Sequence, residues 1–317
     1  MKRWRLFVLL GAVAAAVSPA LAPSAGVAGS QAARGTLIAF ESFGDTTGGP
    51  PGTAYRSGVW VVRSDGSGLR RLTPNSIGAA QPAWSPDGKR IVFVGSPAGD
   101  DFAFDLYVMR ADGSGLRRLV KLRGGAEAPD WSPDGRTIVF ARYGASFLSD
   151  IYAVGAHGRG LRRLTGAPGD DTDPAWTPDG RLIAFGSGRL GSFHVYVMNP
   201  DGSGQRLLIR KRSGEPAWSP DGRQIAYASA RDGDPDIFVA NADGSGERVL
   251  TRNTAQDFPP TWSPNGRRIA FASNRPAKAR EDSQEFDVWV MNADGSGQRR
   301  VTRMPGGEWN PAWQPRP

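Results

Sequence analysis

A two-part motif repeats six times along this chain of 317 residues. The first part is a tryptophan followed by Ser-Pro-Asp-Gly in three copies and by close variants in two more, and the second part is an Asp-Gly hairpin signal. The tryptophans lie 42 to 51 residues apart, at Trp84, Trp131, Trp176, Trp218, Trp262 and Trp313. The hairpin signals begin at Asp65, Asp112, His157, Asp201, Asp243 and Asp294. Repeats of about this length build solenoids, propellers or arrays, so the repeat constrains the fold more than any other feature.

The stretch from Glu215 to Thr251 shows what one repeat contains. Four short apolar runs are separated by turn and loop signals. The sequence Ser219-Pro220-Asp221-Gly222 suits a type I turn, because proline presets the backbone at the second position and glycine accepts positive φ at the end. Asp243-Gly244 is a second tight hairpin signal. Each repeat is therefore predicted to be a four-stranded antiparallel meander, and six in phase indicate a β-propeller whose tryptophans fill the wedges between blades.

The two ends of the chain complement each other. The run from Gly35 to Phe40 matches the second strand of a repeat, but no Trp-Ser-Pro-Asp-Gly precedes it. The run from Asn310 to Gln314 matches a first, innermost strand, and no further repeat follows it. We therefore predict an all-β, six-bladed propeller over residues 36–317, in which the C-terminal strand completes the first blade and closes the ring.

The N-terminus has the layout of a secretory signal peptide. Lys2, Arg3 and Arg5 precede an apolar run from Leu6 to Val17 and a stretch of small residues. We assign residues 1–28 to the signal, with cleavage after Ala28, and residues 29–35 to a short linker. An uncleaved membrane anchor is the alternative, although the run is short for a membrane span. The expected location is the periplasm or the cell exterior, with no transmembrane span once the signal is removed.

Arginines recur on the last strand of each repeat, and the formal net charge is +8. A basic surface can bind nucleic acid or an anionic membrane. Charge on the outer strand of a blade also prevents edge-to-edge pairing, and this is the interpretation that we favour. No nucleic-acid partner is expected. The chain has no cysteine, which excludes disulfides and thiolate metal sites.

The face of the ring that carries the loops between second and third strands is the expected binding face. These loops vary between repeats, and those at 43–57, 95–104 and 274–286 are long. Variable loops on a rigid scaffold usually bind ligands. The residue three positions before each tryptophan should lie beside the central channel at this face. The channel-mouth residues that we select for binding are Gln81, Asp130, Asp173, Glu215 and Asn310. Such a polar ring can hold a peptide loop, a sugar or a hard cation, although solvated strand ends would look the same.

Metal binding and catalysis have less support. Asp170, Asp171 and Asp173 lie close in sequence and could hold Ca²⁺, which prefers oxygen ligands. No other cofactor is expected. The two histidines, His157 and His194, each replace an aspartate of the repeat, so a histidine metal site or a Ser-His-Asp triad has few candidates. Carboxylate pairs for glycoside hydrolysis remain open, because their separation depends on the fold.

The repeat resembles that of the TolB-type propeller family. The resemblance rests on W-S-P-D-G-x-x-I-A-F, S-x-R, D-I-Y/F, N-x-D-G-S-G and L-T, and it spans about residues 36 to 314. It implies a six-bladed propeller. The family's namesake binds a peptidoglycan-associated lipoprotein in the cell envelope, which implies a protein or envelope partner. The namesake's N-terminal α/β domain is not expected here. Similar propellers precede the hydrolase domain of prolyl oligopeptidase-like enzymes, but this chain has no G-x-S-x-G.

Two functions follow from these patterns. The favoured one is an exported, monomeric, non-catalytic propeller that binds a protein or envelope component through the variable-loop face and the channel mouth. The alternative is an envelope hydrolase or lyase that acts on a saccharide or peptide with channel-mouth carboxylates as acid and base.

Overall fold

The computed structural model describes residues 36–42, 57–97, 104–144, 148–231, 233–275, 285–304 and 306–315. These residues form six four-stranded antiparallel sheets and no helix, so none of their segments is a helix that could cross a membrane. The predicted signal peptide and linker lie outside the described residues, as do most of the long loops expected at 43–57, 95–104 and 274–286.

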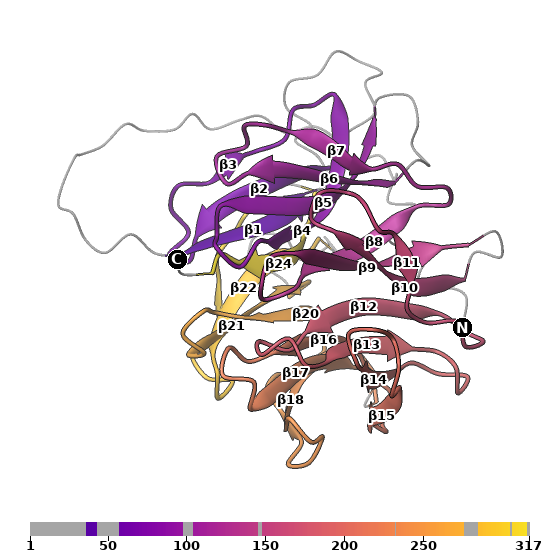
Figure 1. Cartoon of the computed structure of the whole chain (residues 1–317). Coiled ribbons are helices and arrows are strands. Elements are labelled where there is room, and N and C mark those ends of the chain that lie inside the picture. The colour runs from indigo at the N-terminus through magenta and orange to yellow at the C-terminus, as the bar shows by residue number, and fades with distance from the viewer. Residues whose placement is uncertain are drawn as a thin grey trace, which may run out of the picture. The chain divides into compact units, whose positions relative to one another are not determined.

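The blades follow one another along the chain, as the repeat predicts (Figure 1). Blade 1 contains β24 (Glu308–Trp313), β1 (Leu37–Ser42), β2 (Gly58–Arg63) and β3 (Arg70–Arg71). Blade 2 contains β4 (Ile77–Trp84), β5 (Arg90–Pro97), β6 (Asp105–Arg110) and β7 (Arg117–Val120). Blade 3 contains β8 (Ala126–Trp131), β9 (Thr137–Tyr143), β10 (Ser149–Gly155) and β11 (Arg162–Arg163).

The other three blades follow the same order from the innermost to the outermost strand. Blade 4 contains β12 (Asp171–Trp176), β13 (Ile183–Ser187), β14 (His194–Met198) and β15 (Arg206–Ile209). Blade 5 contains β16 (Gly214–Trp218), β17 (Gln224–Ser229), β18 (Asp236–Asn241) and β19 (Arg248–Val249). Blade 6 contains β20 (Asp257–Trp262), β21 (Arg268–Ser273), β22 (Asp287–Asn292) and β23 (Arg299–Arg300).

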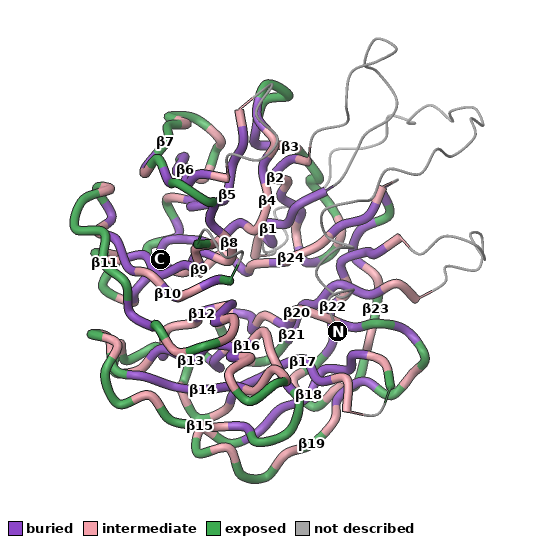
Figure 2. Tube along the Cα trace, turned by 90° about the vertical axis from the view of Figure 1, so that its right-hand side faces the viewer, coloured by how far each residue is buried: buried purple, intermediate pink, exposed green. Residues whose placement is uncertain are grey.

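The C-terminal strand closes the ring, as predicted. β24 pairs antiparallel with β1, so that Trp313 lies opposite Ile38 and Ala312 lies opposite Ala39. Figure 2 shows the innermost strands near the centre of the ring and the outermost strands, with their exposed residues, at its periphery. Each innermost strand contacts the innermost strands of the blades on both sides, which makes the six-bladed all-β ring continuous.

The tryptophans occupy the interfaces between blades, as the sequence indicated. Trp131 of blade 3 belongs to a buried cluster with Val92 and Leu106 of blade 2. Trp84 also donates its indole N–H to the carbonyl of Ala312 in blade 1 at 3.1 Å. Each blade therefore packs a large apolar side chain against its neighbour, and burial of this kind contributes about 25 cal/mol per Å² of apolar surface.

The Asp-Gly hairpins need glycine because they touch the preceding blade. Gly158 has a φ of +82°, and a Cβ at this position would lie 2.3 Å from the carbonyl oxygen of Leu119 in blade 2. A Cβ on Gly202 would lie 2.4 Å from the carbonyl oxygen of Leu164 in blade 3. Glycine here serves both the turn and the close approach of two backbones.

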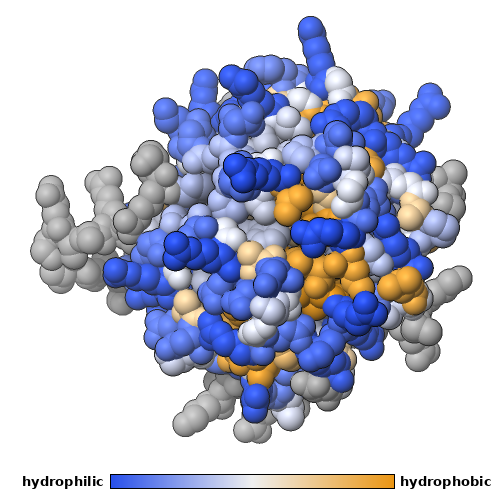
Figure 3. All heavy atoms as spheres, turned by 60° about the horizontal axis from the view of Figure 1, so that its bottom comes forward, coloured by the Kyte–Doolittle hydropathy of each residue, from blue (hydrophilic) through white to orange (hydrophobic). Residues whose placement is uncertain are grey.

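The outer-strand arginines make specific contacts within and between blades. The first arginine of the strand donates to a hairpin carbonyl of the next blade, as Arg248 does to Ala293 at 3.1 Å. A second arginine follows in blades 2, 3 and 6, where it pairs with an aspartate at the start of the third strand of its own blade, as Arg300 does with Asp287 at 2.6 Å. Figure 3 shows one side of the molecule, on which hydrophilic side chains surround smaller apolar patches.

Candidate functional site in the axial channel

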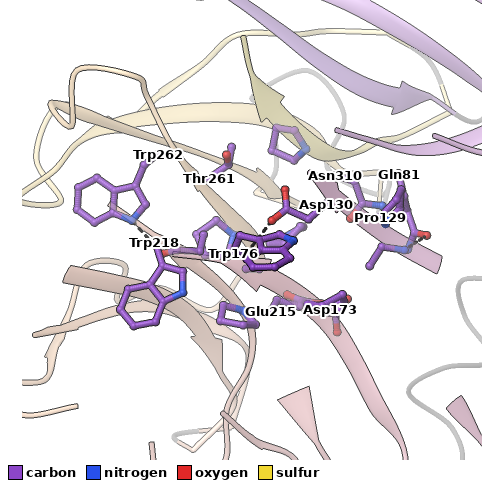
Figure 4. A pocket seen from close by; sticks show the side chains of 18 of the residues that line it. Gln81, Pro129, Asp130, Asp173, Trp176, Glu215, Trp218, Thr261, Trp262 and Asn310 are labelled. Carbon is purple, nitrogen blue, oxygen red and sulfur yellow. Dashed lines mark hydrogen bonds between the residues drawn. The ribbon is translucent and has the colours of Figure 1, made fainter. Parts of the chain in front are cut away.

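A cavity of about 300 Å³ lies on the axis of the ring, and all six innermost strands line it (Figure 4). We call it the axial channel. Its wall alternates between prolines, which precede each tryptophan by two positions, and the mostly polar residues one position earlier. The channel is thus built from the same strand position of every blade.

The polar positions of this wall have an uncommon backbone conformation. Positive φ values of 47° to 53° occur at Gln81, Ala128, Asp173, Glu215 and Asn310. The sixth equivalent, Pro259, follows a cis peptide bond. In all six innermost strands the pairing register with the second strand shifts at this position. Non-glycine residues rarely adopt positive φ, so the surrounding structure must hold these residues in place.

Hydrogen bonds between neighbouring blades hold two of these residues. The amide N–H of Gln81 in blade 2 donates to the Glu41 carboxylate of blade 1 at 2.6 Å. The Gln81 side-chain oxygen in turn accepts from the amide N–H of Ala128 in blade 3 at 2.9 Å. Side chains of one blade thus satisfy the backbone groups that the register shift releases in the next blade.

Asp130 departs from the repeat in a way that affects the channel. The equivalent residue is alanine in blades 1, 2, 4 and 5 and threonine in blade 6. Its carboxylate accepts the amide N–H of Trp176 in blade 4 at 2.8 Å, as the dashed line in Figure 4 shows. Burial raises the pKa of Asp130 to about 6, although the amide groups of Trp176 and Trp131 act in the opposite direction. Asp130 can therefore exchange a proton near neutral pH.

Glu41 supports the channel from the second strand of blade 1, and sequence reasoning did not identify it. Its side chain is 2% exposed. Burial raises its pKa to about 7, while hydrogen bonds with Asn310 and with the amide of Gln81 lower it. The only sequence signal was an acidic residue inside an otherwise apolar run, Leu37–Ser42.

The channel wall is acidic. Asp130, Asp173 and Glu215 line it, and the described lining residues include no lysine, arginine or histidine. Gln81 and Asn310 add two amide side chains. Such a wall suits amine, guanidinium, amide or hydroxyl groups of a ligand, which can donate hydrogen bonds to carboxylates.

The fold brings together the five residues that we selected for binding. All five line the axial channel. They lie one to four residues inside the innermost strands rather than at the first residue, since β12 begins at Asp171 and β4 at Ile77. Whether they bind a ligand stays a prediction.

The aspartates selected for metal binding have separate partners. The Asp170 carboxylate accepts from the amide of Ser149 at 3.0 Å, and Asp171 pairs with Arg189 at 3.2 Å. Asp173 lines the channel. Across the described part of the chain, no group of three or more His, Asp or Glu side chains is placed to hold a metal ion. His194 contacts Ser192 through a 2.9 Å hydrogen bond, and His157 is exposed in a hairpin turn.

Comparisons with known proteins agree with this architecture. TolB from Acinetobacter baumannii has a TM-score of 0.76 and 24% identity, over 89% of this chain and 67% of that chain. A putative TolB from Agrobacterium tumefaciens has a TM-score of 0.66 and 23% identity, over 87% of this chain and 91% of that chain. An oligogalacturonate lyase in complex with manganese has a TM-score of 0.52 and 14% identity, over 87% of this chain and 76% of that chain. These likenesses concern the fold.

No curated protein matches the chain. The family model described as the TolB β-propeller domain matches residues 117–215 and 208–316, which together exceed half of the sequence. The chain therefore belongs to the TolB β-propeller domain family.

Proposed function

We propose that this protein is an exported binding propeller that recognises a protein or cell-envelope component, with the axial channel as part of its binding site. The observation that carries the proposal is the acidic channel itself: three carboxylates from three blades line one cavity of about 300 Å³. Its backbone is held in strained conformations by the neighbouring blades, and residual strain of this kind concentrates at ligand sites.

The acidic wall of the axial channel indicates which chemical group of a partner could be inserted into the channel. Carboxylates accept hydrogen bonds and carry negative charge, so the inserted group should be a lysine, arginine or amide side chain of a loop. The cavity is near the lower end of small-molecule pockets, which suits one inserted side chain better than a folded element. An envelope location rests on the predicted signal at residues 1–28, and a peptidoglycan-associated partner on the family resemblance.

Affinity capture from envelope extract, followed by titration of the captured partner, tests this proposal. The variant Asp173→Asn with Glu215→Gln removes two channel charges at nearly constant shape. We expect it to weaken binding by about 1–3 kcal/mol, because charged hydrogen bonds are lost. The matched control, Asp201→Asn with Asp243→Asn, removes two exposed carboxylates from the same two blades. An equal loss from both variants would mean that net charge, not the channel, governs binding.

The second function is an envelope hydrolase or lyase, and the raised pKa of Asp130 favours it. A carboxyl group that titrates near pH 6 beside the carboxylates of Asp173 and Glu215 can serve as a general acid or base. Turnover of an envelope saccharide or peptide that Asp130→Asn abolishes would establish this function. Full turnover by that variant would exclude Asp130 from the chemistry.

A further inference from the structure

The outer hairpins of blades 1, 2 and 3 differ in composition from those of blades 4, 5 and 6. The first three are 63–71, 110–118 and 155–163, which we call the basic sector. The equivalent hairpins are 199–207, 241–249 and 292–300. The basic sector contains nine arginines and two aspartates, whereas the equivalent hairpins contain four arginines and four acidic residues. The repeat alone does not account for this difference, because all six hairpins have the same length and position.

Ion pairs neutralise only a small part of this charge. Arg118 pairs with Asp105 at 3.3 Å, and Arg163 pairs with Asp150 at 2.6 Å. With Arg118, Arg163 and Arg71, which also has partners, set aside, six arginines remain against the two acidic residues of these hairpins, Asp65 and Asp112. These two aspartates accept hydrogen bonds from serine amides of their own turns. The basic sector thus keeps a clear positive charge.

The three hairpins form one continuous surface. Arg70 of blade 1 donates to the carbonyl of Asp112 in the hairpin of blade 2 at 3.4 Å. A Cβ on Gly113 would lie 2.8 Å from the carbonyl oxygen of Leu72 in blade 1. In the same way, Gly158 of blade 3 lies against Leu119 of blade 2. The charges of three blades therefore act together on whatever lies against this rim.

Apolar side chains project from the same surface. Leu69 is 42% exposed and Leu161 is 41% exposed, and each directly precedes an exposed arginine. Between them, Leu116 packs partly against the core. The equivalent residues of blades 4 to 6 are Gln205, Glu247 and Gln298. The same three blades therefore concentrate both the positive charge and the exposed leucines.

We propose that the basic sector docks on an anionic lipid bilayer. Arginines attract anionic headgroups and extend their charged ends to the interface, and exposed leucines insert into the acyl boundary. Stable attachment of a peripheral protein usually needs two such signals together. Nucleic acid fits less well, since these hairpins contain no Phe, Tyr or Trp for base stacking and the leucines would have no partner there.

Flotation with vesicles tests this docking. The protein should bind vesicles of phosphatidylcholine and phosphatidylglycerol more tightly than vesicles of phosphatidylcholine alone. Replacing Arg70, Arg117 and Arg162 with glutamine should weaken binding to the anionic vesicles on the order of a hundred-fold, because each arginine near such a surface contributes about a fivefold factor. Replacing the equivalent Arg206, Arg248 and Arg299 with glutamine should change binding much less, although the net charge falls equally.

A second pair of variants tests the leucines. Leu69→Ser with Leu161→Ser should weaken binding, whereas Leu148→Ser with Leu190→Ser, exposed in loops at the other end of the blades, should not. The apolar N-terminal run is common to all variants, so it cannot produce these differences. Equal losses from the two arginine variants, or no preference of the unaltered protein for anionic vesicles, would overturn the proposal. Melting temperatures of each variant confirm that folded protein is compared.

Discussion

Arg231 donates a 2.9 Å hydrogen bond to Glu247, which lies just before the outermost strand of its blade. In the blades on either side, the equivalent arginine pairs instead with an aspartate that begins the innermost strand. Arg189 pairs with Asp171 at 3.2 Å, and Arg275 pairs with Asp257 at 2.7 Å. The arginine keeps one carboxylate partner in all three blades, but in blade 5 that partner comes from the opposite edge of the sheet.

Two further residues of blade 5 differ from the repeat where the partner of the arginine differs. Blade 5 has Ser213 where the neighbouring blades have Asp171 and Asp257, and Tyr227 where they have phenylalanine. The Tyr227 hydroxyl donates to Glu247 at 2.9 Å and accepts from Arg231 at 3.0 Å. Burial opposes the charge of Glu247, but hydrogen bonds from Lys211 and Arg231 hold its pKa below the usual value.

Glu247→Gln should therefore destabilise the protein by about 3–5 kcal/mol, because it leaves the largely buried Arg231 without a carboxylate. Adding Ser213→Asp to this variant should restore much of the loss by placing a carboxylate where blades 4 and 6 have one. Urea unfolding of the three proteins measures both effects. An unchanged midpoint for Glu247→Gln would mean that the ion pair contributes nothing.

The sequence predicted the fold because its determinants are local and repeated. Six tryptophans in phase, Ser-Pro-Asp-Gly turns and Asp-Gly hairpins each determine short-range structure, and the unmatched strand around Trp313 had one place to pair. The partner of Arg231 was not predictable in this way. Ser229, Arg231 and Asp236 recur in blade 6 as Ser273, Arg275 and Asp287. Arg231 does donate to Ser229 at 3.0 Å, but Asp236 accepts from Thr251 at 2.9 Å.

The site was predictable in position but not in conformation. The residue three before each tryptophan does line the channel. Positive φ was not expected there, because a residue that precedes proline usually prefers extended conformations and Ala128 or Glu215 has no preference for left-handed backbone. Contacts between blades impose this conformation, and a single repeat contains no information about them.

Ring closure makes a prediction about the C-terminus. Trp313 is 7% exposed and packs with Ile38 and Val62 of its own blade and with blade 6. Trp313→Ala should lower stability by about 3–5 kcal/mol, since a large buried side chain is removed. Deleting residues 308–317 should cost more, because β1 also loses its paired strand. Deleting only residues 316–317 is the control. If the protein that lacks residues 308–317 melts close to the temperature of this control, ring closure by the C-terminal strand is contradicted.

Glu308 makes stability depend on pH. Its side chain is fully buried, accepts from Thr302 at 2.9 Å, and lies beside Asp287, which Arg300 contacts at 2.6 Å. Burial, and then the negative charge of Asp287, raise the pKa of Glu308 from 4.5 to about 9. Burial, with a smaller contribution from the charge of Glu285, also raises the pKa of Asp287. The folded protein therefore holds a proton on Glu308 that the unfolded chain releases above about pH 4.5.

Glu308 has a higher pKa in the folded protein than in the unfolded chain. Its protonation therefore stabilises the fold fully below pH 4.5, and this stabilisation is lost as the pH rises towards 9. Glu308→Gln keeps a neutral side chain of similar shape, so its stability should decline less over this range. At pH 8 the variant should melt at a higher temperature than the unaltered protein, and at pH 4 the two should be similar. Parallel melting curves from pH 4 to pH 9 would show that Glu308 does not titrate in the folded protein.

A comparison of two glycines distinguishes the effect of backbone strain from the effect of close contact between blades. Gly158 and Gly191 have similar positive φ values of 82° and 85°. A Cβ on Gly158 would lie 2.3 Å from the carbonyl of Leu119 in the preceding blade, whereas a Cβ on Gly191 would meet nothing within 4 Å. Alanine at either position destabilises the protein by about 1–3 kcal/mol, because a residue with a Cβ is strained at positive φ. Only Gly158→Ala must also push two blades apart, so its unfolding free energy in urea should fall further than that of Gly191→Ala. Equal losses in the two variants would show that the hairpin moves away from blade 2 without cost, and that the close contact does not determine why glycine is needed there.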